Sequence, residues 1–300
     1  MTISLRVLRP SQWTPHLFVV SAFLSLSGCA GTSKPFEQAI GPAALTSEQI
    51  AEIVGSPDRS AADRTNDLRR KPEQMLAFLE VRKGMTVLDL STGGGYTTEL
   101  LARAVGLTGT AYGQSQPPRA PDTPPRPAVA PEGDSSPQLA RPQTTTIASP
   151  TVRRTSVQAL AERAKNPAVS NLHSVVRPFE DPVPQDLIGR LDLVTLMFNY
   201  HDLGHMGIDR AKMNAAVFAA MKPGATYVIA DHAGRPGTGI SEAGTLHRIE
   251  EAFLRKEVEA AGFRLLEQAD FLRNPSDPRN KNTPEPAQPK DEFVLKFVKP

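Results

Sequence analysis

Histidine and aspartate side chains gather in one stretch of the chain's second half. Four of the six histidines lie there, and two of them have an aspartate as chain neighbour. A histidine titrates near neutrality, so such residues can perform general acid–base catalysis. Imidazole and carboxylate groups also bind divalent metal ions. The stretch therefore offers two kinds of chemistry, through His201, Asp202, His205, Asp231, His232 and His247.

The pattern around these residues predicts that they meet at one edge of a sheet. Leu191–Phe198 and Thr226–Ala230 are nearly continuous apolar runs, as expected for strands covered on both faces. Ligands of open α/β sheets bind outside the carboxyl ends of the strands. Asn199-Tyr200-His201-Asp202 follows the first run, Asp231-His232 follows the second, and His247-Arg248 is expected to open the next helix.

Three interpretations of this cluster remain open. The side chains can be polar loop residues or helix caps without a chemical role. They can perform acid–base chemistry, with His201 as the base, Asp202 and Asp231 as orienting groups and Arg248 as a clamp on the substrate. They can also hold a divalent ion, through His201, Asp202, Asp231 and His232. We favour the acid–base role, and its candidate residues are His201, Asp202, Asp231, His232, His247 and Arg248.

A glycine turn near the start of the predicted sheet is the second constellation. Met85–Leu90 is a short apolar strand, Ser91–Gly95 is a turn of sequence STGGG, and Tyr96–Val105 is the following helix. Glycines let the backbone turn sharply and approach a ligand closely. The turn is not the dinucleotide motif G-x-G-x-x-G, because Thr98 occupies the last position, and it lacks the G-K-[ST] of a phosphate loop.

Strands and helices alternate along the rest of the chain. Pro72 is expected in the first turn of a helix that carries Met75, Leu76 and Leu79 on one face. The alternation predicts a Rossmann-like, doubly wound α/β fold, with a seven-stranded sheet, an antiparallel last strand and helices on both faces. The remaining predicted helices lie at 152–165, 209–221 and 246–261, and the remaining strands at 110–112, 172–176, 263–268 and 292–298.

Proline, with 28 of 300 residues, is concentrated in connecting segments. A proline-rich insertion at 116–150 and a loop at 274–290 interrupt the pattern, and the insertion is a weak candidate for binding a protein partner. Neither side of the insertion holds a complete sheet, so we expect it to lie within one domain. The predicted organisation is a signal segment at 1–29, a tether at 30–62 and one domain at 63–300.

The first residues resemble a bacterial lipoprotein signal. Arg6 and Arg9 precede the apolar run Leu17–Leu26, which is too short for a membrane-spanning helix, and Leu26-Ser27-Gly28-Cys29 follows at once. The alternative is a buried cysteine behind an apolar segment. The resemblance implies acylation of Cys29 and a lipid-anchored protein, at the outer membrane facing the periplasm. The protein is expected in the cytoplasm if the signal is not used.

Composition narrows the classes of protein further. The chain is 39% apolar and 22% charged, which argues against a coiled coil, a multi-span membrane protein and a wholly disordered chain. A net charge of +2 lacks the basic excess of dedicated nucleic-acid binders, so no nucleic-acid partner is expected. The single cysteine excludes a disulfide framework and a cysteine-based zinc site.

The glycine turn and three other landmarks resemble class I S-adenosylmethionine (SAM) dependent methyltransferases, over residues 63–300. Asp89 followed by Gly93–Gly95 is similar to the first motif of that family. Within the class, the chain looks most like predicted bacterial methyltransferases that carry GGGY with a later DH and HR. The other landmarks are Val81-Arg82-Lys83-Gly84, Met221-Lys222-Pro223-Gly224 and Ala260-Ala261-Gly262-Phe263, which are similar to the turns before the family's first, fifth and sixth strands.

The resemblance implies SAM as the cofactor and methyl transfer to a small-molecule acceptor, with a divalent metal as a further option. Two positions depart from the family's pattern. Ser91 stands where the first glycine is usual, and Gln114 stands where an acidic residue would hold the ribose hydroxyls. The implied cofactor contacts are Asp89, Ser91, Thr92, Gly93, Gly94, Gly95, Tyr96, Gln114, Glu180, Asp181 and Asn199.

The two strongest signals disagree about location. A lipoprotein signal directs the chain out of the cytoplasm, whereas SAM is made and used inside the cell. Either the signal is not used, or the fold is retained in an envelope protein that binds another ligand, or the histidine cluster serves a metal-dependent hydrolase. We favour the SAM-dependent methyltransferase.

Overall fold

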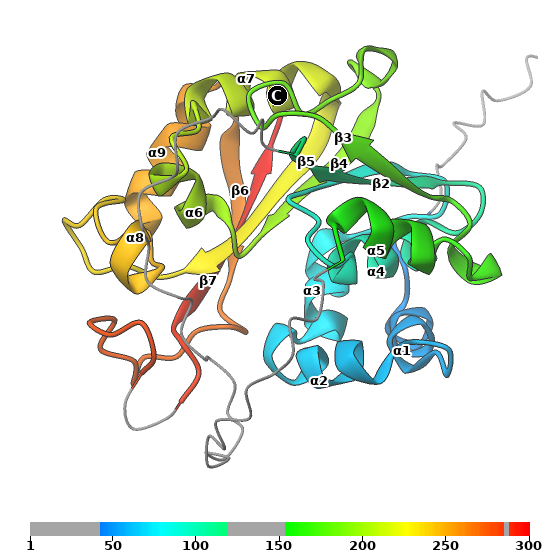
Figure 1. Ribbon diagram of the computed structural model, residues 1–300, viewed down its shortest axis with the longest axis horizontal. Helices are drawn as coiled ribbons and strands as arrows, with labels where there is room; N and C mark the ends of the chain where they lie inside the picture. Colours follow the sequence, from blue (N-terminus) through cyan, green and yellow to red (C-terminus); the bar gives the residue numbers. More distant parts are fainter. Residues whose placement is uncertain (1–42, 119–153, 285–287) are drawn as a thin grey trace, which may run out of the picture. The chain divides into compact units, whose positions relative to one another are not determined.

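Seven strands form one sheet in the order β3-β2-β1-β4-β5-β7-β6 (Figure 1). The first five strands run parallel, and β7 runs antiparallel to both of its neighbours. The predicted doubly wound sheet with an antiparallel last strand is therefore confirmed. The strands are β1 (Thr86–Leu90), β2 (Thr110–Ser115), β3 (Leu172–Val176), β4 (Leu191–Met197), β5 (Met221–His232), β6 (Arg264–Ala269) and β7 (Glu292–Val298).

The computed structural model describes residues 43–118, 154–284 and 288–300. The predicted signal, Cys29, the start of the tether and most of the proline-rich insertion lie outside the described residues. The helices are α1 (Ser47–Gly55), α2 (Ala61–Arg70), α3 (Pro72–Leu79), α4 (Tyr96–Val105), α5 (Ser156–Arg163), α6 (Tyr200–His205), α7 (Arg210–Ala220), α8 (Ala243–Leu246) and α9 (Glu251–Ala260).

Two apolar cores cover the two faces of the sheet. Side chains alternate between the faces along each strand, so Val87 and Leu193 enter one core while Leu88 and Val194 enter the other. The first core contains side chains from α1, α3, α4 and α5, and the second contains side chains from α6, α7 and α9. Figure 1 shows these two groups of helices on opposite sides of the sheet. Burial on both faces explains the nearly continuous apolar runs of β4 and β5.

The predicted tether is wrong for residues 43–62, because this segment folds onto the domain. Helix α1 begins with a capping box between Thr46 and Gln49. Its Ile50 and Ile53 are buried in the core that contains α3 and α4. The small residues and prolines around α1 hide this short apolar period, which spans a single helix of nine residues.

The region after β5 also differs from the expected single helix at 246–261. Helix α8 ends at Leu246, His247 takes a left-handed conformation with φ of 51°, and α9 begins only at Glu251. His247 and Arg248 therefore lie between two helices. A short helix that the pattern did not predict, α6, follows β4 and carries His201 and Asp202.

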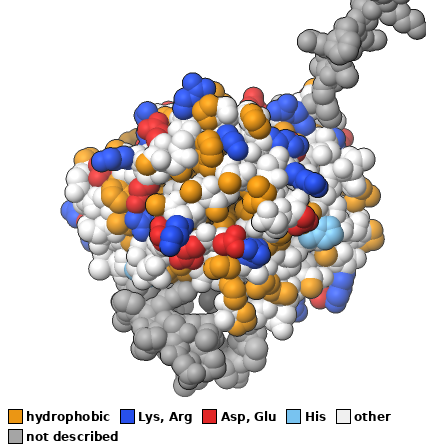
Figure 2. All heavy atoms as spheres, turned by 90° about the horizontal axis from the view of Figure 1, so that it is seen from above, with side chains coloured by type: hydrophobic (Ala, Val, Ile, Leu, Met, Phe, Trp, Pro, Cys, Tyr) orange, Lys and Arg blue, Asp and Glu red, His pale blue; other side chains and the backbone are white. Residues whose placement is uncertain are grey.

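No helix among the described residues is long and apolar enough to cross a membrane. On the face shown in Figure 2, Lys and Arg side chains are interspersed with Asp and Glu. The expectation that the chain binds no nucleic acid stays a prediction.

Candidate functional site

The strand order reverses between β1 and β4, and the loops after these strands meet there. Open α/β sheets bind ligands at such a point. Ser91 follows β1 and Asn199 follows β4, and the Ser91 hydroxyl donates a hydrogen bond of 2.6 Å to the side-chain oxygen of Asn199. The two loops therefore form one continuous rim at the carboxyl edge of the sheet.

A cavity of about 430 Å³ opens on one side of this rim. We call it the Phe179 cavity, after the one aromatic side chain among the described residues that line it. The hydroxyl oxygen of Ser115, at the end of β2, is buried there and has no hydrogen-bond partner among the described residues. The cavity has the size of small-molecule sites. Its walls include Ser91, Gly93, Ser115, Phe179, Asn199 and Met206.

A second cavity, of about 220 Å³, lies on the other side of the glycine turn. We call it the Arg70 cavity, and it shares Ser91 and Gly93 with the first. The Arg70 guanidinium lies 5.3 Å from the ring centre of Tyr96 and 4.7 Å from that of Phe198. Within the described part of the chain, no carboxylate pairs with it. Burial, together with the like charge of Arg69, lowers the pKa of Arg70 to about 10, so it stays a cation at neutral pH.

The glycine turn keeps a left-handed backbone at Ser91, Gly93 and Gly95. At Gly95 any side chain would collide, because a Cβ there would lie 2.7 Å from a methyl group of Leu160. At Gly94, by contrast, a Cβ would meet open space. Arg163 of α5 holds the turn from outside by donating a hydrogen bond of 2.7 Å to the carbonyl oxygen of Gly94.

Asp89 is buried at the end of β1, beside the Arg70 cavity. Its carboxylate accepts hydrogen bonds from the hydroxyls of Thr98 (2.6 Å) and Thr195 (2.8 Å). Burial raises the pKa of Asp89 to about 6, although both hydrogen bonds act in the opposite direction. Asp89 therefore fixes the start of α4 against β4 and borders the cavity with a partly desolvated charge.

Gln114, the residue expected to hold ribose hydroxyls, is fully buried. Its side-chain oxygen accepts from the backbone N–H of Ser91 at 3.0 Å, and its amide nitrogen donates to the carbonyl oxygen of Arg177 at 2.6 Å. The side chain thus ties the turn after β1 to the segment after β3. Both of its polar atoms are engaged, so the neighbouring Ser115 is better placed for a ligand hydroxyl.

The other predicted cofactor contacts differ in how deeply they are buried and in which residues they contact. Thr92 is buried against the Thr98 hydroxyl, and Tyr96 donates a hydrogen bond of 2.7 Å to Asp67. Glu180 accepts from the backbone of Asp209 at 3.3 Å, and the exposed Asp181 pairs with Arg177. Of the two acidic residues after β3, neither lines the two cavities, whereas the preceding Phe179 does.

The histidine cluster is centred on His201, which lies between two carboxylates. Its Nδ1 is 2.6 Å from Asp231 Oδ1 and its Nε2 is 3.2 Å from Asp202 Oδ1. Burial alone would lower the pKa of His201, but the charges of Asp231 and Asp202 outweigh it and raise the pKa to about 10. A buried imidazolium with both nitrogens facing carboxylates cannot accept a proton. The geometry therefore does not fit His201 as a general base. Asp202 and Asp231 do lie where they can orient the His201 ring, as predicted.

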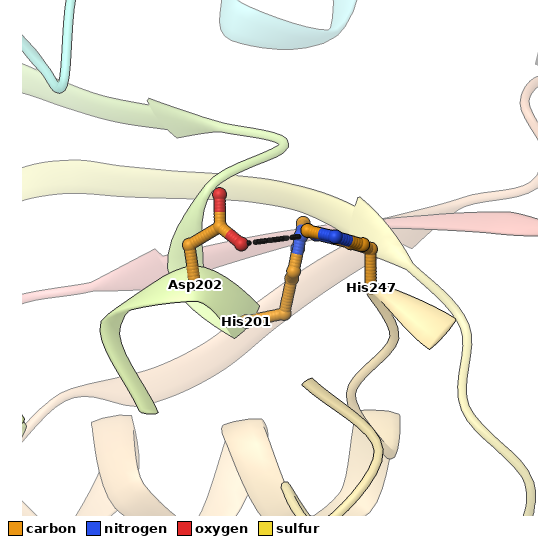
Figure 3. A group of neighbouring side chains, drawn as sticks. All are labelled: His201, Asp202 and His247. Carbon is orange, nitrogen blue, oxygen red and sulfur yellow. Dashed lines mark hydrogen bonds and ion pairs between the residues drawn. The ribbon is translucent and has the colours of Figure 1, made fainter. Parts of the chain in front are cut away.

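Figure 3 shows how His247 approaches the same carboxylate from the segment after α8. Its Nδ1 lies 3.1 Å from Asp202 Oδ1. His205 Nε2, one helical turn from His201, lies 3.8 Å from the same oxygen. Three histidines thus surround one oxygen of Asp202, and its other oxygen accepts a hydrogen bond of 2.8 Å from Asn199.

Two further predicted site residues, His232 and Arg248, contact other residues of the fold and not the cavities. His232 Nδ1 lies 3.0 Å from Glu292 on β7. Arg248, predicted as a substrate clamp, is fully buried, and it pairs with Asp277 at 2.8 Å and donates to the carbonyl oxygens of Ala233 and Lys281. It fastens the loop after β6 to the end of β5. The substrate-clamp hypothesis is wrong for this geometry, because these partners already occupy the guanidinium.

Sequence reasoning missed the residues that line the cavities from outside the glycine motif. Nothing in a single sequence distinguishes Arg70 from the adjacent Arg69, which pairs with Glu292 at 2.8 Å. Phe179 and Met206 read as ordinary core residues. Ser115 could have been found, because it is the last residue of β2 and strand ends carry ligands in this fold.

No family model matches the sequence, and no curated protein matches it. Among solved structures, a SAM-dependent methyltransferase from Aquifex aeolicus is similar at 17% identity, over 81% of this chain and 100% of that one, with a TM-score of 0.49. The geranyl diphosphate C-methyltransferase from Streptomyces coelicolor A3(2) is similar at 13% identity, over 83% and 87% of the two chains, with a TM-score of 0.49. A TehB-like SAM-dependent methyltransferase from Corynebacterium glutamicum is similar at 15% identity, over 85% and 98%, with a TM-score of 0.40. Likeness at this level carries no conclusion about what this chain binds.

Proposed function

We propose that the chain is a SAM-dependent methyltransferase that acts on a small-molecule acceptor. The observation that carries the proposal is the pair of cavities on the two sides of one glycine turn, which share Ser91 and Gly93. A ligand with an amino-acid part and a nucleoside part fits this arrangement, because its two ends need different surroundings. The resemblance of the turn to the first motif of class I methyltransferases supports the same conclusion.

The Arg70 cavity suits the amino-acid end of SAM. Arg70 is a cation without a carboxylate partner in the described residues, held in place between the rings of Tyr96 and Phe198. A carboxylate that enters the cavity would find the Arg70 guanidinium already in position to donate a charge-assisted hydrogen bond. Asp89, on the same wall, suits the ammonium group of the ligand.

The Phe179 cavity suits the nucleoside end. Ser115 offers a buried hydroxyl without a partner, as a ribose hydroxyl requires. Phe179 and Met206 offer apolar surface to a planar base. The open Gly94 and the left-handed Gly93 let the backbone approach the ligand between the two cavities.

When bound, SAM would supply an electrophilic methyl group for an in-line displacement by a lone pair of the acceptor, with S-adenosylhomocysteine as the leaving group. The chain's own residues contribute mainly by positioning, which is the larger part of catalysis for such a displacement. The rim formed by Ser91 and Asn199 fixes the cofactor's cavity, and Asn199 also holds Asp202 of the histidine cluster. The cluster is therefore linked through Asn199 to the rim of the Phe179 cavity.

A matched pair of glycine substitutions tests the proposal. Gly94→Asp adds a carboxylate at a residue that lines the Arg70 cavity, and a Cβ there meets nothing within 4 Å. Gly55→Asp adds the same group at an exposed position where a Cβ also meets nothing within 4 Å. We expect Gly94→Asp to lose SAM and S-adenosylhomocysteine binding by at least about tenfold, which corresponds to about 1.4 kcal/mol. Gly55→Asp should bind like the natural chain. Unchanged binding in a folded Gly94→Asp variant would refute the proposed cofactor site.

The location is a separate proposal that rests on the sequence alone. We propose that Cys29 is acylated and anchors the chain to the outer membrane on its periplasmic side. Expression with a labelled fatty acid should label the natural chain and not Cys29→Ser, and Cys29→Ser should leave the membrane fraction. A natural chain that stays unlabelled in the cytoplasm would refute the anchor and leave the methyltransferase proposal untouched.

A further inference from the structure

Three donor atoms in the histidine cluster converge on one point. His201, Asp202 and His247 each offer one ligand atom, and these three atoms all lie within 4.8 Å of one another (Figure 3). The aspartate oxygen is 3.2 Å from the first nitrogen and 3.1 Å from the second. Metal–ligand bonds of about 2.0–2.2 Å place neighbouring ligands about 3 to 3.5 Å apart, so both distances suit a shared ion.

Asp231 contacts His201 in the way that a carboxylate commonly contacts the second ring nitrogen of a metal-bound histidine. Asp231 Oδ1 lies 2.6 Å from Nδ1, and the carboxylate is itself fixed by the backbone N–H groups of His201 and His232, each at 2.8 Å. A carboxylate on Nδ1 keeps the proton at that nitrogen, so a metal ion that displaces the proton from Nε2 would bind the lone pair there. Although Asp202 is near, His201 Nε2 makes no hydrogen bond of normal geometry with the described residues.

The other donors are also held from outside. Asn199 donates to Asp202 Oδ2 at 2.8 Å, which leaves Oδ1 turned toward the two histidines. His247 has a left-handed backbone, with φ of 51°, although it is not a glycine. Such backbone conformations cluster at active sites and ligand-binding sites. His205 Nε2 lies 3.8 Å from Asp202 Oδ1, at the edge of the cluster.

We propose that His201, Asp202 and His247 form a binding site for one divalent first-row transition-metal ion. The class of ion follows from the donors, because two imidazoles and one carboxylate suit Zn²⁺, Mn²⁺ or Fe²⁺, whereas Mg²⁺ and Ca²⁺ prefer oxygen ligands alone. Three protein ligands leave positions open on the ion for water or for an oxygen atom of another molecule. The site differs from the set suggested by the sequence, because His247 takes the place of Asp231 and His232.

The two displaced residues have other partners in the structure. Asp231 has no exposed surface, and its carboxylate oxygens serve the imidazole and two backbone N–H groups. His232 Nδ1 lies 3.0 Å from a carboxylate oxygen of Glu292. Asp231 is therefore a positioning residue for His201, and His232 belongs to a separate pair.

Titration calorimetry on the full-length chain tests the site without SAM and without an acceptor. The protein carries no polyhistidine tag and is first treated with EDTA, and Zn²⁺, Mn²⁺, Mg²⁺ and Ca²⁺ are added in separate runs. We expect one Zn²⁺ per chain at micromolar affinity or tighter, and no heat from Mg²⁺ or Ca²⁺. Bound Co²⁺ should show a visible absorption spectrum of nitrogen and oxygen ligation. A folded chain that binds no transition ion at millimolar concentration would overturn the proposal.

Variants assign the binding to this cluster. His247→Gln and Asp202→Asn should each weaken Zn²⁺ binding by at least about tenfold. His173→Gln is the matched control, because His173 is exposed on β3, outside the cluster, and the same residue type is removed. Asp231→Asn should weaken binding by about 10- to 100-fold through the loss of support. Zn²⁺ binding that is unchanged in both His247→Gln and Asp202→Asn would overturn the assignment, whatever the SAM titration shows.

Discussion

The Asn199 side chain bonds to Ser91 with its oxygen and to Asp202 with its nitrogen, at 2.6 and 2.8 Å. One amide therefore connects the rim of the proposed cofactor cavity to the histidine cluster. The connection depends on the strand order, because β1 and β4 are neighbours in the sheet although about a hundred residues separate Ser91 from Asn199. The amide supplies both a donor for the Asp202 carboxylate and an acceptor for the Ser91 hydroxyl.

Replacing this amide with a carboxylate should cost stability in a pH-dependent way. In Asn199→Asp, the donor to Asp202 becomes a second negative charge, and we expect the free energy of unfolding to fall by about 1–3 kcal/mol at pH 7.5. Like charges raise a carboxyl pKa, so protonation near pH 4.5 should return much of the loss. Urea unfolding at the two pH values measures this. An equal loss at both would contradict the proposed repulsion.

Arg70 should matter only for ligands that carry a carboxylate. We expect Arg70→Met to weaken SAM binding by about 1.5–3 kcal/mol, the usual value of a hydrogen bond to a charged group. 5′-Methylthioadenosine, which lacks the amino-acid end, should bind the variant and the natural chain alike. Arg82→Met is the control, because Arg82 is exposed and precedes the amino end of β1. If Arg70→Met weakened both ligands equally, the carboxylate would not be in the Arg70 cavity.

Asp89 should lower the stability of the ligand-free protein above about pH 6. Its pKa is about 6 in the folded chain and about 3.9 when unfolded, so the folded state holds the proton more tightly. Stability from this group is therefore present below about pH 4 and is lost as the pH rises to about 6. Asp89→Asn should lack this loss and be about 1–3 kcal/mol more stable than the natural chain at pH 7.5.

Denaturant unfolding of both proteins between pH 4 and 8 checks the Asp89 prediction. Only the difference between the two curves is diagnostic, because other groups titrate in both proteins. A difference that does not change with pH would mean that Asp89 is not the source. The same variant should bind SAM more weakly, since Asp89 lines the Arg70 cavity.

Arg248 should be a stability residue and not a substrate-binding one. Its guanidinium pairs with the buried Asp277, so Arg248→Met would leave a buried carboxylate without its partner. Breaking such a pair costs about 3–5 kcal/mol. Arg255→Met, in which an exposed arginine of α9 is lost, should cost far less. Full stability of Arg248→Met would contradict this account and revive the clamp hypothesis.

The fold could be predicted from the sequence because its strands are short apolar runs separated by amphipathic helices. Leu191–Met197 is buried almost throughout, and this made its run of apolar residues easy to identify. The sequence does not reveal helix α1, because α1 buries only Ile50 and Ile53, which are too few residues to establish a helical period. The break at His247 could not be predicted, because a left-handed non-glycine residue is imposed by tertiary contacts.

The candidate site was predictable by position and not by role. Strand ends identified Asp202 and Asp231, which do meet at His201. Which nitrogen of His201 faces which carboxylate depends on α6, whose start at Tyr200 the pattern does not reveal. Arg70 and Arg248 show the same limit, since burial and pairing decide whether an arginine receives a ligand or fastens a loop.

Direct titration of SAM and S-adenosylhomocysteine into the full-length chain tests the central claim, which is that the two cavities around the glycine turn hold this cofactor. We predict one site per chain with micromolar affinity for both, and a higher unfolding temperature in their presence. ATP and NAD should not compete, because the turn lacks the sequences that bind their phosphates. A folded sample that shows no heat of binding at millimolar SAM would contradict the methyltransferase proposal.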